Sequence, residues 1–393
     1  MEKAINTFEL KGNDYEMGLK QGKTFQRQIR NFYKDLTTSD EFLASKPILF
    51  PRFLFKRLAT LFSSRMIRKS IQQYFPSQWN FLKGLSKATD LSINKILFLQ
   101  AIDALGAQIT HYRVGEISSS LNNCSAVGIT GEVSSTDGVL IVKNWDGPDF
   151  LAKCCIFRNI YPKNDNKFST IGSGVIGLVG INNGMNEKGL SIVYNYVYLK
   201  DIGKEGIPPM IIIRGALENC SSVKEAISYF QQFPLLGGAN IMVGDINGDL
   251  AILELSPKKM EVRREGFDGI SSYLIITNHF LIPSMKELEI PKNSVYDEKA
   301  AKSLQNKLVH QSSILRYKNA KEVLMQSPDK ISLDYLNKEI QCSHGNKNKP
   351  SEFTFCNHGT EISTGFGVMI DIKNRQFYAT LGNPCQVKMK RLE

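Results

Sequence analysis

The feature that most constrains the fold is a change of pattern at Cys124. Before it, apolar spacing predicts helices over about 15–33, 48–75 and 93–105. After it, short apolar runs alternate with turn residues, beginning with AVGITGEV, SSTDG and VLIVKNW. Helices are expected again near 209, over 223–233, 312–325 and 333–340, and hairpins around DINGD and DIKNRQ. This order favours an α+β layered domain with largely antiparallel sheets.

Composition narrows the class of protein. With 42% hydrophobic and 22% charged residues, the 393-residue chain is typical of a globular protein. Its seven cysteines, an odd number, do not indicate a disulfide framework and favour a reducing compartment. Charged residues near the N-terminus interrupt any signal peptide, and no run of 18 apolar residues predicts a membrane helix. We therefore expect a cytoplasmic protein.

Much of the net charge of +11 lies in the segment 42–89, which contains no Asp or Glu. Large apolar residues recur there at helical spacing with Lys and Arg between them. A helix packed on its own core, with a solvated basic face, would explain this pattern. Peripheral contact with an anionic membrane or a lipid-like substrate would explain it too. Nucleic acid is not expected, because no zinc-finger, RRM or KH signature accompanies the charge.

Two motifs imitate ligand sites without the required context. Gly172, Gly174 and Gly177 spell GxGxxG, but the sequence continues as strand and turn, with no helix to receive a pyrophosphate. DINGDLAILE resembles a calcium loop, but Gly248 comes too early for the calcium-loop glycine and Glu254 too early for its last ligand. An Asn-Gly hairpin turn explains this second motif.

Two Cys-x-His pairs, Cys342–His344 and Cys356–His358, lie fourteen residues apart. Zinc ligands in a pair are usually separated by at least two residues, so we expect no metal and no other cofactor. His111 and His310 are expected to be ordinary surface or core residues.

Cys124 follows two asparagines at the start of a predicted strand. A free thiol there is usually a small buried hydrophobe, and no histidine is marked as its partner. If the Asn123–Cys124 bond is cut, however, the α-amine of Cys124 can act as its base, since such amines titrate near pH ~8. One residue then supplies both nucleophile and base.

The hairpin CSAVGITGEVSSTDGVLIVKNWD resembles the nucleophile hairpin of the N-terminal nucleophile (Ntn) hydrolases. It is most similar to the peptidase C45 group of acyl-coenzyme A:6-aminopenicillanic acid acyltransferase. Choloylglycine hydrolases and the acid ceramidase group are more distant. The resemblance also covers YEMGLKQGK, GMNEKGLSIVYN, ITNHF, SSILRY, FCNHGTEIST and TLGNPC.

This resemblance implies an Ntn αββα four-layer sandwich preceded by a helical N-terminal segment. Residues 1–123 would form the α chain after self-cleavage, and residues 124–393 the hydrolase core, the β chain. Both parts together would remain one compact unit.

The resemblance also assigns roles to individual residues. Cys124 matches the nucleophile and Asn123 the residue before the cleaved bond. Asp146 matches the aspartate that holds the new α-amine. Asn278 matches the asparagine whose side-chain amide faces the oxyanion, and Asn195 a second oxyanion donor. Taken one by one, Asp146 would be explained as a turn residue and Asn278 as a strand-end cap.

Four further residues are expected to contact substrate. Lys143 stands where choloylglycine hydrolases carry an arginine, and Trp145, His279 and Phe280 lie beside the expected catalytic residues. Trp145 also suits a core position. For Arg316 and the run 356–358, packing and chemistry remain equal alternatives.

The predicted function is hydrolysis of a linear amide through an acyl thioester on Cys124, or transfer of the acyl group to another amine. The basic segment favours a fatty-acyl or lipid-like amide. A small polar or aromatic amide is the alternative substrate. An uncleaved, non-catalytic lipid-binding protein is the alternative of another class.

Overall fold

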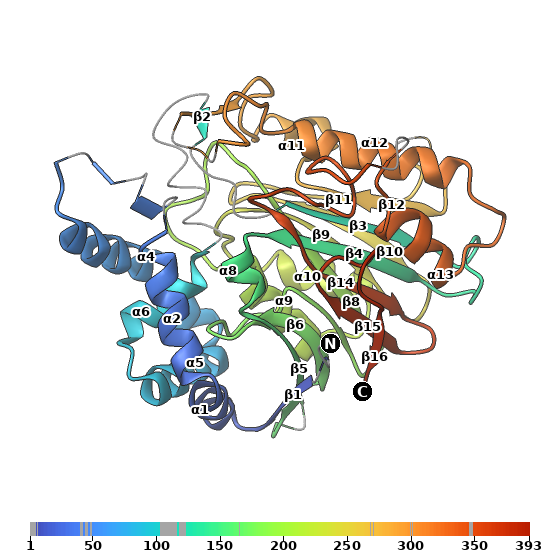
Figure 1. The fold of residues 1–393 in the computed structure, drawn as a ribbon. Helices are drawn as coiled ribbons and strands as arrows, with labels where there is room; N and C mark the ends of the chain where they lie inside the picture. The colour runs from blue at the N-terminus through green and yellow to red at the C-terminus, as the bar shows by residue number, and fades with distance from the viewer. Residues whose placement is uncertain are drawn as a thin grey trace.

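Two sheets packed face to face form the centre of the molecule, with helices on their outer faces (Figure 1). The computed structural model describes residues 5, 7–39, 42–43, 46–47, 49–102, 116–117, 123–164, 166–267, 269, 271–298, 300, 302–345 and 349–393. The helices are α1 (Asp14–Thr24), α2 (Gln26–Leu36), α4 (Arg52–Tyr74), α5 (Pro76–Thr89), α6 (Ile93–Gln100), α8 (Asp149–Ala152), α9 (Pro209–Asn219), α10 (Val223–Phe230), α11 (Pro283–Lys286), α12 (Gln311–Met325), α13 (Leu333–Tyr335) and the π-helical η1 (Leu336–Gln341).

The strands form one eight-stranded sheet, one six-stranded sheet and a short parallel pair. The order is β1-β5-β6-β7-β8-β9-β10-β11 in the first and β12-β3-β4-β14-β15-β16 in the second. All neighbours in these two sheets are antiparallel except β1 and β5. Their bounds are β1 (Thr7–Gly12), β3 (Asn123–Ile129), β4 (Leu140–Gly147), β5 (Cys155–Pro162), β6 (Thr170–Val175), β7 (Asn183–Asn186), β8 (Ser191–Val197), β9 (Gly238–Gly244), β10 (Leu250–Leu255), β11 (Met260–Arg263), β12 (Tyr273–Ile276), β14 (Ser363–Asp371), β15 (Gln376–Leu381) and β16 (Lys390–Leu392), with β2 (Glu116–Ile117) and β13 (Val295–Tyr296) as the pair.

The layers follow from the contacts between elements. Helices α9 and α10 cover strands β7 to β10 of the first sheet, and α12 and η1 cover β3, β4 and β12 of the second. Strands β3 and β8 touch between the sheets. The expected αββα order, with helices α1 to α6 preceding it, is therefore confirmed.

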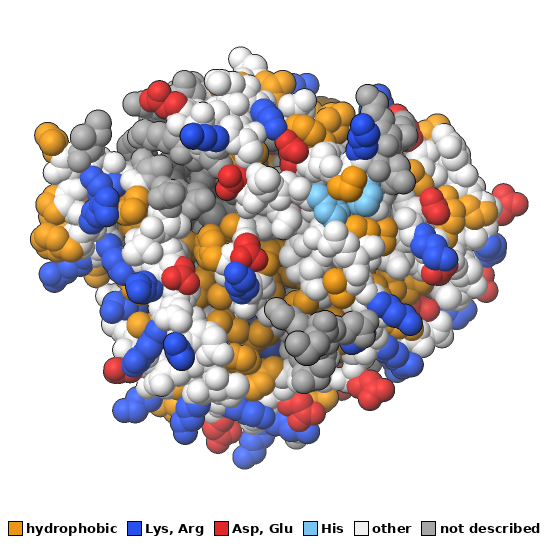
Figure 2. Space-filling view, in the orientation of Figure 1, with side chains coloured by type: hydrophobic (Ala, Val, Ile, Leu, Met, Phe, Trp, Pro, Cys, Tyr) orange, Lys and Arg blue, Asp and Glu red, His pale blue; other side chains and the backbone are white. Residues whose placement is uncertain are grey.

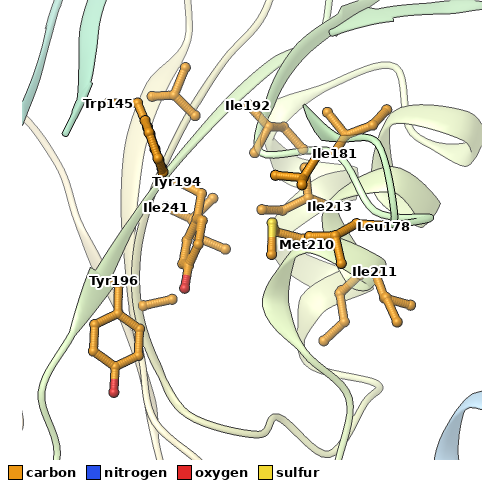
Figure 3. Close-up of a cluster of buried hydrophobic side chains, with 14 of the residues drawn as sticks. Trp145, Leu178, Ile181, Ile192, Tyr194, Tyr196, Met210, Ile211, Ile213 and Ile241 are labelled. Carbon is orange, nitrogen blue, oxygen red and sulfur yellow. The ribbon is translucent and has the colours of Figure 1, made fainter. Parts of the chain in front are cut away.

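Successive side chains of β3 point alternately into two different apolar cores. Cys124 and Ala126 belong to the large apolar core between the sheets. Val127 and Ile129 point the other way and join a second core with Leu324 of α12. The large core continues to the far side of the first sheet, where side chains of β8 and β9 meet those of α9 (Figure 3).

The N-terminal helices are integral to the same unit. Asn13 and Glu16 form a capping box that starts α1. Helix α1 then packs closely on α5, because Gly18 and Gly84 leave no room for side chains: a Cβ at Gly18 would lie 2.1 Å from the Phe81 carbonyl oxygen. Before these helices, β1 pairs with β5 at the edge of the first sheet.

Several expected boundaries shift. The helix predicted over 15–33 divides at Phe25 into α1 and α2. The helix predicted over 93–105 is α6 to Gln100, and positions 103–105 and His111 lie outside the described residues. Strand β6 ends at Val175 without a helix after the GxGxxG motif, and an Asn-Gly turn with Gly248 at φ +92° joins β9 to β10. None of the described helices is long and apolar enough to cross a lipid bilayer.

A buried ion network ties α1 to α9, and breaking it should destabilise the fold. The Arg214 guanidinium contacts the carboxylates of Asp14 and Glu218, both at 2.7 Å, and is itself fully buried. We expect Arg214→Met to lower the free energy of unfolding by about 3 kcal/mol, because the carboxylates of Asp14 and Glu218 would keep only Lys167 as a cation. Urea unfolding measures this. Lys338→Ala, which breaks an exposed pair with Asp334, is the control and should change little; equal effects of both variants would contradict the network's role.

Candidate active site

Three side chains from three elements hold the backbone of Cys124. Its amide nitrogen donates to Asn278 Oδ1 at 2.9 Å. Its carbonyl oxygen accepts from Asn195 Nδ2 of β8 at 3.0 Å and from the guanidinium of Arg316 in α12 at 2.6 Å. The residue is 2% exposed and lies opposite Trp145 in the β3–β4 ladder. The structure thus brings together Cys124, Asn195 and Asn278, three of the four residues expected to be catalytic.

The orientation of Asn278 differs from the expectation. Two donors, the Cys124 amide and Arg316 Nη2 at 2.9 Å, require its oxygen to point toward Cys124. Its amide nitrogen instead donates to the Tyr196 carbonyl at 2.8 Å. In this state Asn278 therefore accepts a hydrogen bond from Cys124 and does not present its amide to an oxyanion.

Asn195 contacts the carbonyl oxygen of Cys124, whereas Asn278 contacts its amide nitrogen. The side-chain nitrogen of Asn195 lies 3.0, 3.1 and 3.3 Å from the carbonyl oxygens of Cys124, Ile276 and Thr277. Its side-chain oxygen is buried without a partner among the described residues. These contacts hold the start of β3 against the end of β12. That Asn195 also donates to an oxyanion stays a prediction.

Asp146, the fourth expected catalytic residue, lies directly opposite Asn123 in the β3–β4 ladder and is fully buried. Its Oδ1 accepts from Thr364 Oγ1 at 2.7 Å. Its Oδ2 has no hydrogen-bond partner among the described residues. Burial raises the pKa of Asp146 to about 6, although Arg316 and the side chains of Thr364 and Asn357 act in the opposite direction. The site thus contains a buried carboxylate close to Cys124.

The thiol of Cys124 is protonated in this environment. Burial raises its pKa above the ordinary value, and the charge of Lys143 only partly opposes this. Lys143 is buried, and its Nζ donates to the Tyr194 carbonyl and, at 3.2 Å, to Asn182 Oδ1. A base is therefore needed before the thiol can attack a carbonyl.

The other residues expected to contact substrate are buried or already engaged. Trp145 stacks on Phe366 with ring centroids 5.3 Å apart, and Phe280 is fully buried in the core. Both side chains therefore pack in the core, and their contact with substrate stays a prediction. His279 Nδ1 lies 2.7 Å from Ser313 Oγ, and burial lowers its pKa to about 3, so its ring is neutral at physiological pH.

Arg316 is the residue whose position the sequence left undecided. It is fully buried, and burial lowers its pKa while the negative charge of Asp146 raises it. Ser313, one turn earlier in α12, accepts the Asn278 backbone amide at 2.8 Å. The spacing of Ser313 and Arg316, three apart in SSILRY, places both on one helix face and is the signal that could have indicated a shared site.

A cavity of about 250 Å³ adjoins Asn123, the residue before Cys124. Apolar side chains line part of it: Tyr296, Leu304, Leu308, Val309, Phe353 and Ile362. Polar and charged side chains line the rest: Ser303, Lys307, Ser312, Glu352, His358, Thr360 and Glu361. Space for a group with both apolar and polar parts therefore exists on the N-terminal side of Cys124.

Comparison with known proteins identifies relatives. The family model for acyl-coenzyme A:6-aminopenicillanic acid acyl-transferase matches residues 133–386, well over half of the chain. The 40 kDa form of the acyltransferase of that name from Emericella nidulans is 24% identical over 228 residues. That match covers 57% of this chain and only 58% of the relative.

Solved structures give weaker matches. A conjugated bile acid hydrolase from Clostridium perfringens aligns with 68% of this chain and 96% of its own, at 16% identity and a TM-score of 0.39. A Caenorhabditis elegans orthologue of N-acylethanolamine-hydrolyzing acid amidase aligns with 64% and 93%, at 14% identity and a TM-score of 0.40. These scores are too low to support a functional inference.

The raised pKa of Asp146 predicts a pH-dependent stability difference. The neutral form is favoured in the folded state, so this contribution is complete below pH 3.8 and is lost as the pH rises through about 6. In a Cys124→Ala background, we expect Asp146→Asn to gain stability relative to its parent between pH 4 and 7.5, by up to about 3 kcal/mol. Urea unfolding at several pH values measures it.

Asp137→Asn is the control, and we expect its stability to depend on pH in the opposite direction. Lys330 lowers the pKa of Asp137, so its ionised form stabilises the folded state and is lost as the pH falls. That variant should therefore lose stability relative to its parent as the pH rises. A stability difference for Asp146→Asn that does not change with pH would contradict the assignment.

Proposed function

Because the chain belongs to the acyl-coenzyme A:6-aminopenicillanic acid acyl-transferase family, we propose that it cuts its own Asn123–Cys124 bond and then cleaves a linear amide through a thioester on Cys124. The observation that carries this proposal is the unsatisfied Oδ2 of Asp146. A buried carboxylate oxygen without a donor is costly. The α-amine of a freed Cys124 would supply that donor.

Self-cleavage would begin with attack of the Cys124 thiol on the Asn123 carbonyl carbon. The C–N bond breaks, the nitrogen receives the proton that the thiol gives up and becomes the α-amine of Cys124, and a thioester links Asn123 to the sulfur. Water then hydrolyses the thioester, which leaves a carboxylate on Asn123 and restores the thiol. The hydrogen bond from the Cys124 amide to Asn278 supports this step, because it holds the future amine in place.

The mature reaction repeats the same chemistry on a substrate. The α-amine takes the thiol proton, the sulfur attacks the amide carbonyl, and the leaving amine receives that proton. The acyl thioester is then resolved by water or by a second amine. Arg316 and Asn195 would keep the backbone of Cys124 fixed throughout, through their contacts to its carbonyl oxygen.

Hydrolysis is the favoured outcome, because water is always present while transfer needs a second shaped pocket. Turnover of an N-acyl amide with increasing concentrations of an added amine distinguishes the two outcomes. We expect free acid to remain the main product. A dominant acylated amine would make the protein an acyltransferase.

Helix α4 supports a lipid-like substrate. In its second half, Met66, Ile67 and Ile71 pack on the core. In its first half, Phe53 and Phe62 are instead 76% and 55% exposed, so packing on the core does not account for them. Figure 1 shows α4 at the edge of the molecule, and Figure 2 shows apolar and basic side chains together there. We propose that this surface meets an anionic membrane from which a fatty-acyl amide is drawn.

Intact-protein mass spectrometry tests self-cleavage. Dividing 44.2 kDa in proportion to 123 and 270 of the 393 residues, we expect chains of about 14 and about 30 kDa from the wild type. Cys124→Ala should remain one chain of 44.2 kDa. Cys220→Ala removes another buried thiol and should still be cut. A single chain in all three would favour the uncleaved lipid-binding protein of the same fold.

Sedimentation with phosphatidylserine-containing vesicles tests the membrane surface. At low salt we expect the wild type to bind, and a Phe53→Ser, Phe62→Ser double variant to bind at least tenfold less, because the apolar insertion is lost. Met325→Ser in α12 is the control, since Met325 is 68% exposed and lies outside this surface. Failure of the wild type to bind would refute the membrane proposal and leave the amidase proposal intact.

A further inference from the structure

We propose that His344, Cys356, His358 and Cys385 bind one structural zinc ion. Their ligand atoms all lie within 4.8 Å of one another. They come from three segments that are distant in sequence: the turn after η1, the loop before β14 and the turn after β15. Two imidazoles with two thiolates are a ligand set that zinc prefers in closed sites.

Four of the six distances between the ligand atoms match a tetrahedral metal site. Zinc bonds of about 2.05 Å to nitrogen and 2.3 Å to sulfur imply edges of about 3.3 Å for N···N, 3.6 Å for N···S and 3.8 Å for S···S. The two histidine Nε2 atoms are 3.2 Å apart, and the two sulfurs are 3.6 Å apart. His358 Nε2 lies 3.5 Å from Cys356 Sγ and 3.3 Å from Cys385 Sγ.

Hydrogen bonds alone do not explain this convergence. His358 Nε2 faces four polar atoms within 3.5 Å, on His344, Cys356, Cys385 and Asn383. A ring nitrogen has either one hydrogen or one lone pair, so it can satisfy only one of them well. A cation at the centre would use the lone pairs of both imidazoles and both sulfurs at once.

A disulfide between Cys356 and Cys385 is the competing explanation. Their sulfurs lie 3.6 Å apart, well beyond the roughly 2.05 Å of an S–S bond. Both cysteines are free thiols in this structure. The spacing corresponds to two ligands of one metal and not to a covalent bond.

The surroundings fit a closed structural site. Asn383 donates its amide to the Asn357 carbonyl at 2.8 Å and faces Cys356 Sγ at 3.7 Å, the kind of contact that orients a thiolate ligand. Four protein ligands leave no position for water or substrate, so the metal would crosslink loops and not take part in catalysis. Cys385 is exposed, and Figure 2 shows histidine side chains at the surface, so an ion has access.

The proposal departs from the expectation of no metal. The sequence grouped Cys342 with His344, but Cys342 Sγ instead faces Asn337 Oδ1 at 3.7 Å. Cys385, 27 residues after His358, takes its place. The short Cys-x-His spacing does not rule out this zinc site, because Cys356 and His358 would contribute only half of its ligands.

Metal analysis of the untagged, full-length chain tests the site. After expression with added zinc, purification under reducing conditions and gel filtration, we expect about one zinc per chain by inductively coupled plasma mass spectrometry. Cys342→Ala is the matched control and should keep its zinc. Cys385→Ala, which removes the exposed ligand, should retain well under half. The same ratios are expected in Cys124→Ala, so the result is independent of self-cleavage and of any enzyme activity.

Thermal unfolding gives a second readout if a variant is unstable. A strong chelator should lower the Tm of the wild type and of Cys342→Ala, and leave that of Cys385→Ala unchanged. Absence of zinc from the reduced wild-type chain would overturn the proposal, as would full zinc content in Cys385→Ala. A Cys356–Cys385 disulfide found by peptide mass spectrometry in freshly purified protein without zinc would also overturn it.

Discussion

The burial of two opposite charges near one cysteine, Cys124, constrains the rest of the structure. Asp146 enters from β4 and Arg316 from α12, and each shifts the pKa of the other in the direction of its charged form. Neither charge is tolerable in a dry core without its partner and its hydrogen bonds. The second sheet and its covering helix therefore have to pack in one register, with Cys124 between them. The strict alternation of β3 then directs the thiol into the space between the sheets.

Periodicity predicted most of the fold, because each element carries its own signal. The alternating strands after Cys124 and the helices expected near 209 and from 223 appear where the sequence placed them. Strand β1 could not be predicted in the same way, since it gains its partner β5 only in the folded sheet. The position of Phe25 between α1 and α2 depends likewise on tertiary packing, including its edge-to-face contact with Phe8 of β1.

The candidate site shows the same division between local and long-range information. Cys124 is marked by the residues around it, and the resemblance added Asp146, Asn195 and Asn278. The direction of the Asn278 amide was not predictable, because it is fixed by two donors from β3 and α12 that meet only in three dimensions. Cys385 was missed for the same reason, since nothing in its own segment connects it with His344.

Strand β1 has a consequence for any two-chain form of the protein. It lies at the edge of the first sheet beside β5, and Asp14 follows it into the ion network with Arg214. A cut before Cys124 would leave these contacts intact. Residues 1–123 and 124–393 would then be separate chains, and their association would no longer be intramolecular. Refolding would then become a concentration-dependent second-order process, while the unfolding of the assembled form would still be governed by its own barrier. Once unfolded, the two-chain form would therefore regain its structure more slowly in dilute solution than a single chain does.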